Sequence, residues 1–285
     1  MRKLEILEPN SVDEALQMLV ELGDDAKILA GGTAVVLMYS QRLIAPTHLI
    51  SLGQIEDLDY IRHEPGIGLR IGALTTHRTV ECSSLVRDKY PIVADTFHQV
   101  ANVRVRNQAT VGGVLAEADY ASDPPSVLIA LGALVKVAGI DGMRTIPISD
   151  LITGYYETDL RPGEVILEVI IPDLAENHGA SYIKYVTRSS EDRPCVGVAA
   201  IVEFGKDRVC EELRIVVGAV AEIPQEFSNI CSIAKGERIT SNVARKIGVD
   251  YAGEIDPISD MRGSGWYRKE LIQVLVERAI LQASG

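Results

Sequence analysis

The chain has 285 residues and a net charge of −12, from 28 Lys and Arg against 40 Asp and Glu. Its length allows two or three compact units, and its ordinary apolar content does not predict disorder. The charge argues against nucleic acid as a main partner, because a phosphate backbone is held by clustered Lys and Arg.

The amino terminus, MRKLEILEPN, has no long apolar stretch after Arg2 and Lys3, so we expect no signal peptide. No segment approaches the roughly 20 apolar residues that span a bilayer. We therefore expect a cytoplasmic protein without a membrane span. The cysteines form no C-x-x-C pair and no Cys/His cluster with metal spacing. We expect free thiols, no metal site and no iron–sulfur cluster in this chain.

Residues 1–53 predict a β-α-β-α-β unit. A short strand at 4–7 is followed by Ser11 and Glu14, a capping box that starts a helix ending at Gly23. The remaining expected elements are a buried strand at 27–30, a helix at 35–43 and a strand at 48–52.

Residues 54–172 predict a mixed α+β unit. Its first part suggests a hairpin across Pro65-Gly66 and helices that start at Thr75 or Thr76 and at Pro91. A further helix is expected at 123–132, with strands at 134–138, 144–148 and 165–171.

Residues 178–285 predict a third, smaller unit. Strands are expected at 181–188, 196–204 and 208–221, and helices at 225–235, 241–249 and 264–283. In the last helix an apolar stripe at helical spacing predicts a face that packs on the core. The stripe consists of Trp266, Leu271, Val274, Leu275, Ala279 and Ile280.

Two glycine loops, 30–34 and 109–114, suggest a site for a pyrophosphate. Glycine permits positive φ and leaves room for a close approach, and successive N–H groups in such turns converge on an anion. A helix that starts after Thr33 would add its positive end. For either loop alone, a tight turn that packs a helix on a strand is the simpler alternative. Neither loop has the spacing of a G-x-G-x-x-G fingerprint or a P-loop.

A family resemblance rests on five segments that occur in this order: LAGGTAVVLM, IGALTTH, VRNQATVGGVLAEADYASDPPSVLIALGA, YIKYVTRSSEDRPCVGVAA and DPISDMRGSGWYRKELIQVLVERAI. From about residue 3 to 283 the chain resembles the FAD-binding (medium) subunit of the molybdenum hydroxylases, of the carbon monoxide dehydrogenase and xanthine dehydrogenase type. The resemblance implies an α+β, two-subdomain PCMH or vanillyl-alcohol-oxidase-type FAD-binding fold. A small C-terminal α/β domain follows, with a three-stranded antiparallel sheet and helices.

The resemblance also implies that FAD lies between the subdomains, with main-chain donors of both glycine loops around its pyrophosphate. Carried over position by position, cofactor contacts are expected from Leu29, Ala30, Gly31, Gly32, Thr33, Ala34, Thr76, Thr110, Val111, Gly112, Gly113, Val114, Asp123, Leu160, Ile166, Leu167 and Lys184.

Several of these positions have a structural alternative. Asp123 precedes a proline and is suited to a helix N-cap. Lys184 is equally compatible with a solvated strand lysine. Thr76 and His77 are explained as well by a helix cap and a surface histidine. The apolar positions, and above all those at 160, 166 and 167, are compatible with plain core packing.

Val114 stands where the family usually has asparagine after its glycine pair, so a side chain that could bond the cofactor is missing. Arg106 and Asn107 fit the family pattern, which implies support of the loop or contact with a partner subunit; a solvated Arg104–Arg106 pair is the alternative. Asp260 and Arg262 are expected to pair or to cap the last helix. Candidates for shielding the flavin ring are Tyr155, Tyr156, Tyr182 and Tyr185.

In this family, the resemblance implies, a large subunit hydroxylates the substrate at molybdopterin. Two 2Fe–2S clusters in a small subunit then carry electrons to FAD, and an acceptor such as NAD, oxygen or a quinone receives them. No catalytic side chain is assigned to this chain. Two other functions stay open: a stand-alone flavin reductase, similar to the enolpyruvoyl-sugar reductases, and a scaffold subunit without flavin.

Overall fold

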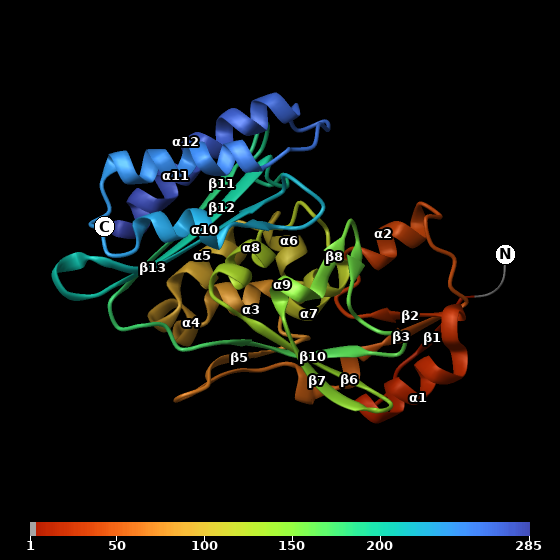
Figure 1. Cartoon of the computed structure of the whole chain (residues 1–285). Helices are drawn as coiled ribbons and strands as arrows, with labels where there is room; N and C mark the ends of the chain where they lie inside the picture. The colour runs from red at the N-terminus through yellow and green to blue at the C-terminus, as the bar shows by residue number, and fades with distance from the viewer. Residues whose placement is uncertain (1–3) are drawn as a thin grey trace.

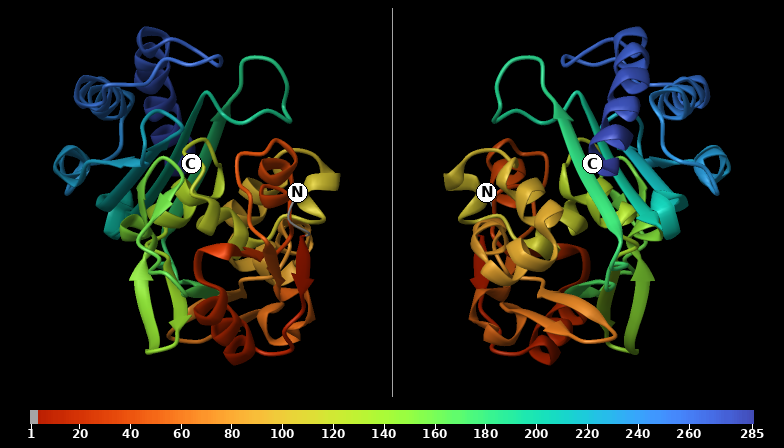
Figure 2. Two further views of the ribbon diagram at one scale, coloured as in Figure 1. Left: turned by 90° about the vertical axis from the view of Figure 1, so that its right-hand side faces the viewer. Right: turned by 90° about the vertical axis from the view of Figure 1, so that its left-hand side faces the viewer.

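The computed structural model describes residues 4–285; residues 1–3, with which the first expected unit begins, lie outside the described residues. The chain is arranged in layers (Figure 1). Two long helices cover one face of the C-terminal sheet, and a layer of short helices lies between that sheet and a second, five-stranded sheet. A small parallel sheet flanks these layers at the N-terminal side (Figure 2).

The N-terminal unit has the predicted β-α-β-α-β order. Its elements are β1 (Glu5–Leu7), α1 (Val12–Leu22), β2 (Ala26–Leu29), α2 (Val35–Ser40) and β3 (His48–Ser51), with the strands parallel in the order β1-β3-β2. Ser11 caps α1 by accepting the N–H of Glu14, and the Glu14 carboxylate reaches back to the N–H of Asn10. The predicted capping box is thus shifted by one residue on its return bond.

The second sheet is antiparallel, in the order β4-β5-β10-β6-β7. Its strands are β4 (Ile61–Glu64), β5 (Gly68–Gly72), β6 (Leu134–Gly139), β7 (Gly142–Pro147) and β10 (Val165–Ile171). The hairpin β4–β5 turns at Pro65-Gly66, as predicted. The sequence patterns did not predict a further small hairpin, β8 (Ile152–Gly154) with β9 (Glu157–Thr158).

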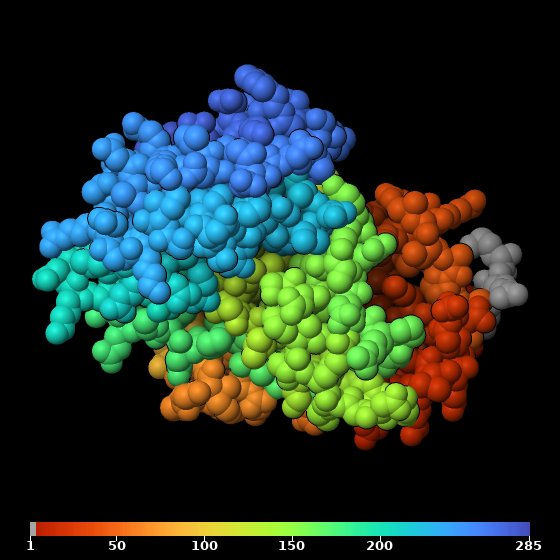
Figure 3. All heavy atoms as spheres, viewed as in Figure 1, coloured from red at the N-terminus to blue at the C-terminus, as the bar shows by residue number. Residues whose placement is uncertain are grey.

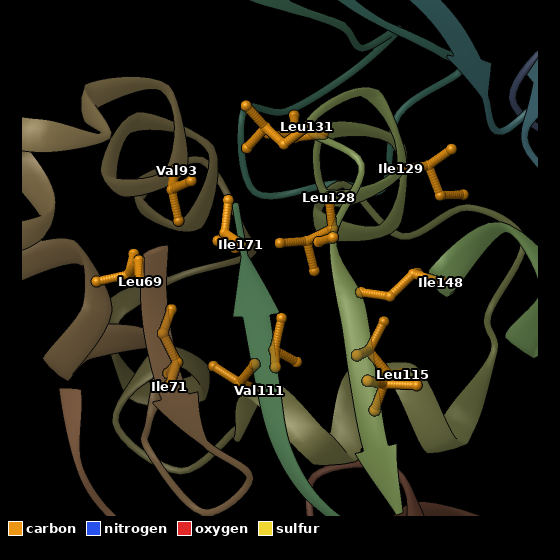
Figure 4. Packing of buried hydrophobic residues seen from close by; sticks show 14 of the residues in the cluster. Leu69, Ile71, Val93, Val111, Leu115, Leu128, Ile129, Leu131, Ile148 and Ile171 are labelled. Carbon is orange, nitrogen blue, oxygen red and sulfur yellow. The ribbon is translucent and has the colours of Figure 1, made fainter. Parts of the chain in front are cut away.

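Short helices fill the layer above this sheet. They are α3 (His77–Cys82), α4 (Ser84–Lys89), α5 (Pro91–His98), α6 (Val103–Arg106), α7 (Val111–Glu117), α8 (Pro124–Ala130) and α9 (Ile148–Leu151). Figure 4 shows the core between them and the sheet, where Leu69 and Ile71 of β5 face Val111 of α7. Burial of these apolar side chains is the main force that holds such short helices in place.

The C-terminal unit has one more strand than the three predicted. β11 (His178–Tyr185), β12 (Val196–Phe204), β13 (Cys210–Gly218) and the two-residue β14 (Gln225–Glu226) form an antiparallel sheet in this order. The helices α10 (Ser228–Cys231), α11 (Ser241–Glu254) and α12 (Gly265–Ser284) follow. The predicted helix at 225–235 is wrong over β14, because a strand of two residues has no periodicity that a sequence pattern could show.

The predicted stripe of α12 is partly wrong. Trp266 is 73% exposed and Val274 is 42% exposed, whereas Leu275, Ala279 and Ile280 are buried as predicted. The buried face also contains Arg268, Ile272, Val276 and Ala283. At 100° per residue, Trp266 and Val274 lie well away from the line of these buried positions.

The C-terminal sheet shares a core with the helices of the second unit. α8 packs on β12 and β13, and Ala199, Ile201 and Val216 belong to the same apolar cluster as Leu128. A Cβ on Gly218 would overlap the hydroxyl of Ser126, so only glycine allows this approach. The two units therefore pack as one body.

Candidate functional site

The two glycine loops lie against each other. A Cβ on Gly31 would overlap the carbonyl oxygen of Gln108 and would lie 3.3 Å from the Cα of Ala109. The first loop thus touches the backbone just before Thr110, where the second loop begins. Glycine at position 31 is required by this contact, because any side chain would push the two segments apart.

Residues 73–77 hold the second loop from the other side. The N–H of Val111 donates to the carbonyl of Thr75 at 3.0 Å, and the N–H of Gly112 donates to the carbonyl of Ala73 at 2.8 Å. A Cβ on Gly112 would lie 2.7 Å from the Cβ of Ala73. The sequence patterns indicated Thr75 only as a possible start of a helix and indicated no contact for Ala73, because their role here comes from this long-range pairing.

The expectation that the main-chain donors of the second loop are free for a ligand is wrong for residues 111–114. Besides Val111 and Gly112, the N–H of Gly113 donates to the hydroxyl of Thr110 at 3.1 Å, and the N–H of Val114 donates to the Thr110 carbonyl at 3.1 Å. Thr110 is the N-cap of α7, and an N-cap takes up the first helical amides. Its hydroxyl proton remains able to donate to a ligand. Val114 is 8% exposed and packs in the core.

The first loop fits an anion. In the part of the chain that the structure describes, the N–H groups of Gly31, Gly32, Thr33 and Ala34 make no hydrogen bond within the protein. Gly32 has φ +75°, and no side chain caps α2, which begins directly after Ala34. Four successive free amides in such a turn suit the diphosphate of a dinucleotide.

The remaining apolar positions lie in or beside the core. Ile166 is 5% exposed, and Leu160 packs on the same cluster. Leu167 packs on the core of the N-terminal unit, and its carbonyl accepts the N–H of Ala73 at 2.9 Å. These contacts account for all three residues without a ligand, and their contact with a cofactor stays a prediction.

Asp123 and Lys184 form a buried pair. The Lys184 ammonium lies 2.9 Å from the Asp123 carboxylate and 2.8 Å from the carbonyl of Gln99, and the Tyr182 hydroxyl donates to Asp123 at 2.7 Å. Burial raises the pKa of Asp123, and Lys184 counteracts this. The alternative of a solvated Lys184 is wrong. Asp123 does stand at the N-cap position of α8, as its alternative predicted, but its side chain makes no capping hydrogen bond. An unpaired buried carboxylate destabilises a protein more than a missing side-chain cap does, so the Asp123 carboxylate bonds Lys184 and not the first amides of α8.

His77 is buried, with 1% of its surface exposed, so the surface alternative is wrong. Its Nε2 lies 3.2 Å from the Thr110 carbonyl, and its ring meets Phe97 edge to face. Burial lowers the pKa of His77 to about 4. Thr76 caps α3 by accepting the N–H of Thr79, so one of its two predicted roles is confirmed.

Arg106 supports the turn before the second loop. It is 7% exposed, donates to the Glu81 carboxylate at 2.9 Å, and donates to the carbonyl of Val100 at 3.0 Å. Burial raises the pKa of Glu81, but hydrogen bonds from His98 and Arg106 outweigh it and lower that pKa. The solvated-pair alternative is therefore wrong for Arg106, although Arg104 is exposed.

Asp260 and Arg262 pair at 2.9 Å, as one of the two alternatives predicted. The other is wrong, because Ser264 caps α12. Of the four tyrosines, Tyr182 is bound to Asp123, and the Tyr185 hydroxyl lies 2.5 Å from that of Tyr267. Tyr155 and Tyr156 are exposed at the β8–β9 turn. Figure 3 shows a hollow between the light-green part of the chain, to which this hairpin belongs, and the red and orange N-terminal part.

Comparison with known proteins decides the family. The family model described as "FAD binding domain in molybdopterin dehydrogenase" matches residues 2–174, and that of the "CO dehydrogenase flavoprotein C-terminal domain" matches residues 181–283. The chain belongs to the FAD subunits of the molybdenum hydroxylases. The predicted resemblance, fold class and flavin cofactor are confirmed.

Similar proteins match this FAD subunit along its whole length. The 6-hydroxypseudooxynicotine dehydrogenase complex subunit alpha of Paenarthrobacter nicotinovorans is 33% identical, over 96% of this chain and 92% of its own. The carbon monoxide dehydrogenase medium chain of Hydrogenophaga pseudoflava is 31% identical, over 95% and 94%. A solved structure of carbon monoxide dehydrogenase from that organism superimposes with a TM-score of 0.94 at 30% identity, over 99% of this chain and 97% of that one.

None of the helices within residues 4–285 is long and apolar enough to cross a membrane. Across those same residues, no group of three or more His, Cys, Asp or Glu side chains is placed to hold a metal ion. The four cysteines are free thiols; Cys82 is exposed, and the other three are buried.

Proposed function

We propose that this chain is the electron-transfer subunit of a heteromeric molybdenum hydroxylase, placed between the 2Fe–2S clusters of a small partner subunit and an external acceptor. A large partner subunit with molybdopterin would oxidise the substrate. The names of the relatives, a complex subunit and a medium chain, support an assembly of this kind, since they match over 95% or more of this chain. The observation that carries the site is the set of four free amides at residues 31–34, next to the second loop.

This chain's contribution is to bind and orient. The amides of the first loop would hold the diphosphate of FAD, and the Thr110 hydroxyl would add a donor from the second loop. When bound, FAD supplies two-electron and one-electron chemistry. Leu29, Ala30 and the residues around Thr76 and Val111–Val114 would shape the walls of the site. No residue of this chain is assigned a covalent or proton-transfer step.

The buried pair joins Asp123, at the start of α8, to Lys184 of β11. We propose that Asp123 contacts the ribityl or pyrophosphate region of FAD with Lys184 near the cofactor, and that Leu160 and Ile166 or Leu167 line the flavin or the adenine. Because Asp123, Lys184 and Tyr182 already bond one another, they would hold the cofactor by shape and fixed charge.

Two alternative functions, a stand-alone flavin reductase and a scaffold without flavin, fit the observations less well. A stand-alone flavin reductase would need its own substrate site and proton donor, whereas the relatives named as subunits share the whole chain, C-terminal domain included. In a scaffold without flavin, the free N–H groups of residues 31–34 would have no ligand to bind. The external acceptor (NAD, oxygen, a quinone or another) and the predicted cytoplasmic location are open to direct assay and cell fractionation.

The deciding experiment is purification of the complex through a tag on this chain. We expect flavin absorption, release of one FAD per chain on acid treatment, and co-purification of subunits that contain molybdenum and iron. The isolated chain should bind FAD but should not reduce a dye with substrate. A complex without flavin, or substrate oxidation by this chain alone, would contradict the proposal.

A further inference from the structure

Residues 118–123, here called the connector, join α7 to α8. They therefore follow the helix that contains the second glycine loop, and they end at Asp123. The connector contains no helix or strand. It begins at Ala118, whose φ of +48° is unusual for a residue other than glycine. The Ala118 carbonyl accepts the N–H of Tyr156 at 3.1 Å, which ties this end to the β8–β9 hairpin.

The middle of the connector is bonded to the C-terminal domain through Tyr120. Its hydroxyl donates to the Asp260 carboxylate at 2.9 Å and accepts from the Arg262 guanidinium at 3.0 Å. Asp260 is held in turn by Arg268 of α12 at 2.6 Å, and Arg268 is completely buried. The connector is thus linked through one phenol to the core of the C-terminal domain.

Two further connector residues bond the same domain. The Asp119 carboxylate lies 2.5 Å from the Arg193 guanidinium, which belongs to the segment between β11 and β12. Asp123 bonds Lys184 and Tyr182 of β11. The side chains of Asp119 and Asp123 are 2% and 4% exposed, and Lys184 is buried with Asp123, whereas the Arg193 side chain is 51% exposed.

We propose that the C-terminal domain clamps the connector and that Tyr120 and Asp260 are positioning residues for the cofactor site. This inference rests on the proposed FAD site. α7 has seven residues, and its first turn is already fixed to residues 73–75. Holding its far end fixes the Thr110 hydroxyl and Asp123 relative to the amides of the first loop. Loss of the clamp would let FAD leave without unfolding the chain.

The test uses the intact complex and compares three variants. Tyr120→Phe keeps the ring, which packs on Tyr155, and removes only the bonds to Asp260 and Arg262. Asp260→Asn removes the charge from the other partner. Tyr251→Phe is the matched control: its hydroxyl bonds the carbonyl of Ile215 inside the C-terminal domain and makes no bond to the connector. FAD release is followed by flavin fluorescence, and flavin circular dichroism reports the ring's surroundings.

We expect Tyr120→Phe and Asp260→Asn to release FAD about tenfold faster than wild type, the size of one lost hydrogen bond to a charged group. Both should alter the flavin circular dichroism, and the double variant should be no worse than the poorer single one. Tyr251→Phe should lower the melting temperature but leave both signals unchanged.

An unchanged release rate in Tyr120→Phe, or equal acceleration in Tyr251→Phe, would overturn the clamp and leave the FAD site intact. If Asp260→Asn fails to fold because Arg268 loses its partner, Tyr120→Phe still decides. A wild-type complex that contains no FAD would overturn the proposed function and this inference together.

Discussion

Gly31 connects two segments that lie almost eighty residues apart. Its missing side chain lets the first loop rest on the backbone of Gln108. The neighbouring amides can face outward because the loop is supported from behind by protein backbone and not by its own hydrogen bonds. Position 31 therefore requires glycine because a side chain would collide with the neighbouring backbone. Position 32 favours glycine for a different reason, its positive φ of +75°.

We predict that Gly31→Ala separates the loops and weakens FAD binding at least tenfold, or ~1.4 kcal/mol. Gly253→Ala in α11 is the control, since nothing lies within 4 Å of a Cβ there and alanine favours a helix. FAD content after gel filtration measures both variants. Full FAD content in Gly31→Ala would show that the two loops can move apart without consequence for the cofactor.

His77 should make the protein sensitive to mild acid. It would titrate near 6.5 in the unfolded chain but at about 4 when buried, so between these values the unfolded state binds more protons. The contribution of neutral, buried His77 to the free energy of unfolding should therefore be fully present above pH 6.5. It should fall by about 3 kcal/mol as the pH drops to 4. Urea unfolding of wild type and His77→Gln across this range measures the effect. Parallel stability curves for the two proteins would contradict it.

At the scale of elements, the two glycine loops differ in kind although their sequences look alike. The first leaves its amides free before the six-residue α2, whereas the second is the capped start of α7. The difference comes from Thr110, which stands before its glycine pair and bonds Gly113, whereas Thr33 stands after its pair and is exposed.

Removal of this cap should weaken α7. We predict that Thr110→Ala lowers the free energy of unfolding by about 1 kcal/mol, whereas Thr110→Ser, which keeps the hydroxyl, is close to wild type. Thermal unfolding of the FAD-free protein isolates this structural effect from any loss of cofactor contacts. Equal melting temperatures for the two variants would show that the cap bond contributes nothing.

At the scale of the whole molecule, the C-terminal domain completes the core of the FAD-binding part. α8 lies between the two sheets and packs on β12 and β13 (Figure 1). Without the C-terminal domain, the apolar face of α8 that shares a cluster with Ala199, Ile201 and Val216 would be exposed to water. Apolar surface of this kind is a source of aggregation.

We therefore predict that a fragment of residues 1–174 is insoluble, or binds hydrophobic dyes, and retains no FAD. Solubility, dye fluorescence and flavin content of the fragment, with the full chain as reference, are the measurements. A soluble, monomeric fragment that holds FAD would show that the first 174 residues form an independent domain.

Local sequence patterns were enough to predict most elements and the family. Periodicity, caps and turn residues locate β1–β3, the hairpin at Pro65-Gly66 and the helix begun by Pro91, because these signals act within a few residues. They could not predict β14, the β8–β9 hairpin or the exposure of Trp266. Those features depend on which neighbour happens to pack against a short segment.

Which polar groups contact each other depends on the folded arrangement of distant segments. Asp123 and Lys184 were both expected at the cofactor, but the structure pairs them, and Tyr120 bonds Asp260 from 140 residues away. In the folded chain the N–H groups of residues 111–114 are bonded within the protein, whereas those of residues 31–34 are free. Hydrogen bonds and ion pairs between distant segments depend on distance and burial, and neither is encoded in local spacing.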